Sequence, residues 1–154
     1  TSFNIKAYPE DKNIQVAVTS GRVKIDELAK TDSAISLTKG ITRNQILLYT
    51  KDKGLAAITY GDAELASSWK SNLLYFDNAS ISEIARTLER WYNIKVKVVG
   101  SNCDPNKRYT LHFNNEPLNK VLNGLSLLTN TSCSVKDKEV VISVKNCMPI
   151  SLNK

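Results

Sequence analysis

Residues 73–93 read LLYFDNASISEIARTLERWYN, and residues 110–130 read TLHFNNEPLNKVLNGLSLLTN. Aligned with an offset of 37 residues, the two stretches carry similar residues at the same places. The matched pairs are Phe76 and Phe113, Asn78 and Asn115, Ile81 and Leu118, Ile84 and Val121, Leu88 and Leu125, Trp91 and Leu128, and Asn93 and Asn130. A fixed period between chemically similar residues predicts two copies of one folding unit.

Each copy has the pattern of a strand, a helix and a second strand. In the first copy, Ser80-Ile81-Ser82-Glu83 is a capping box, in which the Ser80 hydroxyl can bind the amide three residues on and Glu83 can reach back. Apolar residues then recur at spacings of three and four, which predicts one buried helix face. These residues are Ile81, Ile84, Ala85, Leu88 and Trp91.

The ends of the copies fit the same interpretation. The alternation of Ile94, Val96 and Val98 predicts a strand after the helix. In the second copy Pro117 replaces Ser80 at the helix start, where a missing amide hydrogen costs nothing. Cys133 and Val135 then take the places of Val96 and Val98, so we expect Cys133 to face the core.

The first 60 residues have a different pattern, in which short apolar alternations are broken by turn residues, and this predicts β-strands. Thr19-Ser20-Gly21-Arg22 predicts a tight hairpin, and Lys39-Gly40 and Lys53-Gly54 predict further turns. Between Asp62 and Asn72 the residues are small and polar around Trp69, which is typical of a connector with one aromatic anchor on a neighbouring domain.

The predicted fold therefore has two domains. Residues 1–66 form an N-terminal all-β antiparallel domain, residues 67–72 form a linker, and residues 73–154 form a C-terminal α+β domain built from the repeated βαβ unit.

Composition excludes several classes of protein. The chain has 154 residues, of which 42% are hydrophobic and 23% charged, as expected for a globular protein. The net charge is +6, but Lys and Arg are scattered singly among Asp and Glu, so we expect no nucleic-acid partner. No apolar run is long enough to span a membrane.

The chain lacks the residue combinations of a catalytic or metal site. His112 is the single histidine, and on a strand it points away from the apolar face. Asp62 and Glu64 are the best-placed acidic pair, and solvated surface explains them better. We expect no catalytic residue, no metal and no cofactor. Cys103, Cys133 and Cys147 have no metal-ligand spacing, and either three thiols or one disulfide of unknown pairing fits them.

One strand is a candidate for partner binding. Val140, Val141, Ile142, Ser143 and Val144 come last and lie outside the repeat, so an exposed edge here could pair with a foreign strand. The alternative is that this strand is internal and that its alternation reflects core packing.

With these patterns in place, the chain resembles the extracytoplasmic region of FecR-like anti-sigma factors of the Bacteroidetes type. The residues that carry the resemblance are Thr1-Ser2-Phe3-Asn4-Ile5, Val16-Ala17-Val18-Thr19-Ser20-Gly21-Arg22-Val23, Leu37-Thr38-Lys39-Gly40, Trp69, Leu73-Leu74-Tyr75-Phe76-Asp77-Asn78-Ala79 and Leu88-Glu89-Arg90-Trp91-Tyr92-Asn93. The sequence departs from the family at Ser71-Asn72, where a glycine is usual, and at Lys39-Gly40-Ile41, where Pro-Gly-Glu is common.

The resemblance implies a FecR-type β domain followed by a domain similar to the short N-terminal domain of secretins and TonB-dependent receptors. It implies a periplasmic location within a single-pass inner-membrane protein, so the membrane helix and a cytoplasmic sigma-binding part would lie upstream of this chain. The implied partners are the periplasmic signalling domain of a TonB-dependent receptor and, through the cytoplasmic part, an extracytoplasmic-function (ECF) sigma factor. Two alternatives stay open: a secretin-like structural domain of the envelope and a carbohydrate-binding domain.

Overall fold

The computed structural model of the chain describes residues 1–28, 33–100 and 106–144. Strands predominate, and all but one of their pairings are antiparallel within these ranges. The contacts divide the chain into two compact units, Thr1–Ser71 and Asn72–Lys154. Each unit has its own hydrophobic core.

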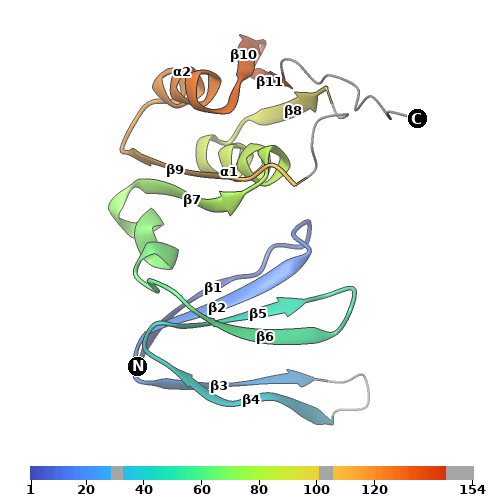
Figure 1. Ribbon diagram of the computed structural model, residues 1–154, viewed down its shortest axis with the longest axis vertical. Helices are drawn as coiled ribbons and strands as arrows, with labels where there is room; N and C mark the ends of the chain where they lie inside the picture. The colour runs from blue at the N-terminus through green and yellow to red at the C-terminus, as the bar shows by residue number, and fades with distance from the viewer. Residues whose placement is uncertain (29–32, 101–105, 145–154) are drawn as a thin grey trace, which may run out of the picture. The chain divides into compact units, whose positions relative to one another are not determined.

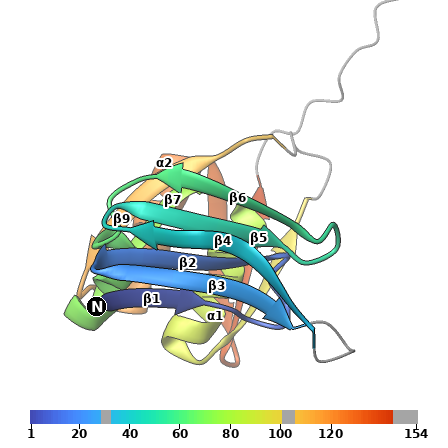
Figure 2. The ribbon, with the colours of Figure 1, turned by 90° about the horizontal axis from the view of Figure 1, so that it is seen from below.

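The first unit consists of two antiparallel sheets and a 3₁₀ helix. Its larger sheet has the order β1-β2-β5-β6, and its smaller sheet is the pair β3-β4. The bounds are β1 Ser2–Lys6, β2 Asn13–Ser20, β3 Arg22–Leu28, β4 Ala34–Thr42, β5 Gln45–Thr50, β6 Leu55–Tyr60 and η1 Leu65–Ser71. Figure 1 shows the β3-β4 pair on one face of the larger sheet, and Figure 2 shows it in front of that sheet from below.

The core of this unit lies between its two sheets. Val16, Val18 and Leu47 from the larger sheet pack with Ile41 of β4, and all four side chains are buried. The segment predicted as a connector continues the unit as helix η1, in which the Trp69 indole N–H donates to Asn4 Oδ1 at 3.1 Å. The aromatic anchor is therefore tied to a residue of its own unit.

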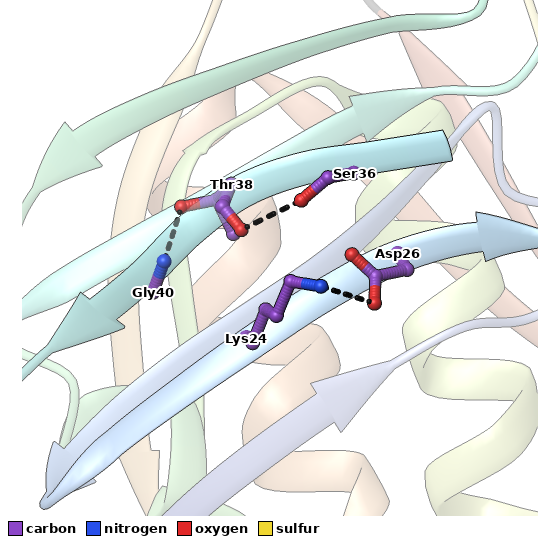
Figure 3. Close-up of polar contacts among 5 residues, drawn as sticks. All are labelled: Lys24, Asp26, Ser36, Thr38 and Gly40. Carbon is purple, nitrogen blue, oxygen red and sulfur yellow. Dashed lines mark hydrogen bonds and ion pairs between the residues drawn. The ribbon is translucent and has the colours of Figure 1, made fainter. Parts of the chain in front are cut away.

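Two predicted turns have a different structure. β2 and β3 belong to different sheets, so residues 19–22 form a corner at Gly21 (φ +79°) and no hairpin. Lys39-Gly40 lies inside β4, where the Gly40 amide donates to Thr38 Oγ1 at 3.0 Å (Figure 3). The chain instead turns after β4, where Asn44 adopts a left-handed conformation (φ 61°). The prediction of a turn at Lys53-Gly54 is correct.

The second unit has two helices and two sheets. β7 pairs with β9, and a second sheet has the order β10-β11-β8. The bounds are β7 Leu73–Ala79, α1 Ile81–Tyr92, β8 Lys95–Val99, β9 Tyr109–Asn114, α2 Leu118–Thr129, β10 Thr131–Lys136 and β11 Glu139–Val144. Both helices lie between the two sheets (Figure 1), and residues from all three layers form one core.

Residues that are 37 positions apart have similar backbone conformations in this unit. Both helices have 12 residues, and their left-handed C-caps are Asn93 (φ 51°) and Asn130 (φ 54°). Asn78 and Asn115 also have positive φ, of 46° and 48°. In the β7-β9 pair, Leu74 lies opposite Phe113 and Phe76 lies opposite Leu111, so both phenylalanines reach the same core.

Candidate interaction edges of the second unit

The strand predicted to bind a partner is the central strand of its sheet. Residues 140–144 lie in β11, which pairs with β10 on one side and with β8 on the other. The prediction of an exposed edge is therefore wrong. Val140 and Ile142 are fully buried, so the alternation reflects core packing. The backbone of β11 already has a partner on each side, which leaves no room for a foreign strand.

The edges of this sheet belong to β8 and β10. Within the described ranges each of them pairs only with β11. In β8, Lys95 and Lys97 are exposed, while Val96 and Val98 pack against the core. Because side chains alternate along a strand, both lysines lie on the outer face of the sheet.

A carboxylate from helix α1 occupies part of the β8 edge. Glu89 Oε1 accepts a hydrogen bond from the Val96 amide at 2.9 Å. That amide therefore points away from β11, toward the open side of the strand. Because the amide and carbonyl of one residue point to the same side and neighbouring residues alternate, Val98 also presents its backbone groups at this edge.

The end of helix α1 sets this geometry. Asn93 takes the left-handed conformation and reverses the chain, and the Ile94 amide donates to the Glu89 carbonyl at 3.2 Å. The strand that follows runs back along α1 and passes the Glu89 side chain. Tyr92 fixes the same region to the loop before α2, because its hydroxyl donates to the Glu116 carbonyl at 2.7 Å. Burial, together with the Glu116 charge, raises the pKa of Tyr92.

The start of α1 has the predicted capping box. The Ser80 amide donates to Glu83 Oε2 at 2.8 Å, and the Glu83 amide donates to Ser80 Oγ at 3.3 Å. Partial burial acts to raise the pKa of Glu83, but the Ser80 hydrogen bonds and the charges of Arg108 and Arg86 together lower it below its ordinary value. The box thus holds an ionised carboxylate at the positive end of the helix.

The described polar groups of the first unit form separate pairs on its surface. Lys24 and Asp26 form an exposed ion pair of 3.0 Å on β3 (Figure 3), and the hydrogen bond from Lys24 is the main reason that the pKa of Asp26 is lowered. Asp62 Oδ1 accepts the Glu64 amide at 2.9 Å, which begins η1, while the Glu64 carboxylate lies 3.9 Å from Arg43. Exposed pairs of this kind contribute little to stability.

The other residues considered as candidates in the sequence are a histidine and three cysteines. His112 is exposed on β9, opposite Tyr75. Cys133 is a half-buried free thiol that packs against the core, as expected, whereas Cys103 and Cys147 lie outside the described residues. No group of three His, Cys, Asp or Glu side chains that could hold a metal occurs in the described part of the chain. Among the helices described, none is both long and apolar enough to cross a membrane.

Comparison with known proteins gives matches to one family and to one kind of solved structure. Residues 73–142 match the family model described as "FecR, C-terminal". Two crystal structures of a "putative anti-sigma factor" from Parabacteroides distasonis ATCC 8503, at 1.65 Å and 2.50 Å resolution, match with TM-scores of 0.78 and 0.77. Each is 25% identical to this chain and is matched over 94% of it. The chain spans 64% of the length of those structures. No curated protein sequence matches.

Proposed function

We propose that this chain is the periplasmic sensor part of a FecR-like anti-sigma factor, because residues 73–142 match the family model described as "FecR, C-terminal". This family match and the similarity to the solved anti-sigma structures support the resemblance found in the sequence. FecR family proteins are membrane-anchored with a periplasmic region, and anti-sigma factors regulate transcription through a sigma factor. The match to this family supports a signalling role.

In the proposed mechanism the chain receives its signal from another protein. The periplasmic signalling domain of a TonB-dependent outer-membrane receptor contacts this chain, and the signal crosses the inner membrane to an ECF sigma factor. The observation that carries the proposal is the family match of the second unit. In the three-stranded sheet of this unit, the edge strands β8 and β10 each pair with one strand in the described structure. Such edges are templates for strand addition.

The proposed domain organisation has a FecR-type β domain first and a duplicated βαβ domain at 73–154. The predicted linker, residues 67–72, overlaps helix η1, which is part of the first unit, so this unit extends to Ser71 rather than to the predicted boundary at residue 66. Support for the duplication comes from the equal lengths of α1 and α2 and from the shared positive φ of Asn78 and Asn115. Positive φ is unfavourable for residues with a side chain, so two independent occurrences at equivalent positions favour one repeated motif.

The test is a binding measurement. The chain is mixed with the periplasmic signalling domain of the TonB-dependent receptor encoded beside it, and heat is recorded by titration calorimetry. We expect a one-to-one complex with a dissociation constant of about 1 μM, as is typical of transient signalling contacts. Absence of binding at about 100 μM, with both proteins folded by circular dichroism, would contradict the proposed function. Assembly of the chain into large rings would favour a secretin-like structural role.

A further inference from the structure

We propose that the open edge of β8 is the docking site, and that it accepts an extended strand with acidic side chains on its outer face. This inference rests on the proposed function, because the receptor's signalling domain is the proposed source of the strand. It adds the surface, the pairing register and the chemistry of the partner.

The backbone of β8 favours strand addition at one register. Val98 presents its amide and carbonyl on the side away from β11, and no hydrogen bond from this side of Val98 occurs in the described structure. The Val96 amide is already bound by Glu89 at 2.9 Å. An incoming strand therefore pairs first with Val98 and with the Val96 carbonyl, and it reaches the Val96 amide only if Glu89 moves.

The charge on β8 selects the partner. Lys95 and Lys97 project from the same face, and neither forms an ion pair with another described residue. Across the sheet Lys95 lies opposite Glu139, whereas Lys97 lies opposite the uncharged Val141. Side chains on directly neighbouring strands are about 5 Å apart, so an acidic residue of the incoming strand would lie beside Lys97. On its inner face the same strand would place apolar residues next to Val98.

The other edge of the sheet has different chemistry. The outer face of β10 carries Ser132 and Ser134, with a lysine only at its last residue, Lys136. An acidic strand therefore gains less there than beside Lys95 and Lys97, of which Lys97 has no acidic cross-strand neighbour. Leu127 and Leu128 form the exposed apolar part of α2, at 86% and 62% exposure, and they are the competing surface that the experiment distinguishes.

Glu89 limits the access of a foreign strand to this edge. Its carboxylate accepts the hydrogen bond of the Val96 amide, which a carbonyl of the incoming strand would otherwise accept. Its negative charge also repels an acidic strand. Substitution Glu89→Ala removes both effects and is expected to tighten binding about threefold. Glu89→Gln keeps an acceptor oxygen without the charge, so its affinity should fall between those of the wild type and Glu89→Ala.

The experiment is calorimetric titration of the receptor's signalling domain into the chain and its variants. K95E/K97E is expected to weaken binding at least about tenfold, since attraction becomes repulsion at two positions. The matched variant K136E/K138E, on β10 and the turn that follows it, should stay within about twofold of the wild type. Amide exchange gives the direct signature: the Val98 amide should gain protection in the complex.

Each outcome has one meaning. If the wild type binds while K95E/K97E binds equally well, or if L127K/L128K removes binding, the docking site is not β8 and the proposed function still stands. If binding leaves Val98 exchange unchanged, strand addition is excluded. If the wild type does not bind, the proposed function fails together with this inference.

Discussion

The two helices of the second unit have the same length and the same left-handed asparagine cap, but different interactions stabilise them. α1 begins with a complete capping box, and its outer faces carry four charged residues, which are Glu83, Arg86, Glu89 and Arg90. α2 begins at Pro117 without a side-chain cap and exposes Leu127 and Leu128. The same backbone structure is therefore stabilised by local polar interactions in α1 and by tertiary packing in α2.

A close contact in α2 shows how it depends on packing. A Cβ atom on Gly124 would lie 2.7 Å from Cε1 of Phe113, so the glycine makes room for the β9 ring. The equivalent residue of α1 is Thr87, whose hydroxyl donates to the Glu83 carbonyl at 2.9 Å. A glycine in a helix costs about 1 kcal/mol relative to alanine, and here the space for Phe113 offsets that cost.

The largest expected effect comes from filling this space. Gly124→Val should lower the free energy of unfolding by about 2 kcal/mol, because the ring of Phe113 must move out of its packed position. Thr87→Val, at the equivalent place in α1, should cost less than about 1 kcal/mol. Urea unfolding followed by circular dichroism measures both. Equal losses in the two variants would show that the helices do not differ in packing.

Removing the cap tests the other half of the comparison. Ser80→Ala removes the hydroxyl that accepts from the Glu83 amide and donates to Glu83 Oε2, and it should cost about 1 kcal/mol. Pro117→Ala removes no side-chain hydrogen bond and should cost about half as much, through greater freedom of the unfolded chain. The same unfolding measurement applies. If Pro117→Ala lowered the free energy of unfolding more than Ser80→Ala, the helix start would contribute more to stability in α2 than in α1.

Acid should weaken α1 selectively. The pKa of Glu83 is lowered in the folded state from its ordinary value of 4.5, so folding favours the ionised form. The stability that it contributes is full above that ordinary value and is lost as pH falls through the lowered pKa. Glu83→Gln removes this dependence, so its stability deficit relative to the wild type should shrink between about pH 7 and about pH 3. A constant deficit would mean that the carboxylate charge is unimportant.

The smallest effect is expected on the exposed face of α2. Leu127 is 86% exposed, so Leu127→Lys should change the unfolding free energy by less than about 0.5 kcal/mol. Differential scanning calorimetry at matched concentrations measures the change. A loss above about 1 kcal/mol would show that Leu127 is covered in solution, and it would weaken the contrast with the charged surface of α1.

Helix α1 could be predicted from sequence because its signals are local. The capping box at Ser80, the apolar spacing and the asparagine at its end lie within a few turns of one another. The central place of β11 could not be predicted, since strand order depends on long-range pairing that alternation does not encode.

The Glu89 contact was also missed, because its position on α1 is typical of a solvated face. One signal could have indicated it: an acidic residue near the C-terminus of a helix opposes the helix dipole. A hydrogen-bond donor outside the helix can offset this unfavourable interaction. For Glu89 the donor is the Val96 amide.

The position of β11 between β8 and β10 affects the order in which the second unit can form. β8 lies early in this unit, yet its only described sheet partner starts at Glu139, more than 40 residues later. During synthesis, β8 must therefore wait for the last described strand before its sheet can form. Pairing over such separations is slow, and the waiting strands are exposed to mispairing and to proteases. Premature termination before residue 139 would leave β8 and β10 without a common neighbour, so the three-stranded sheet of the second unit could not form.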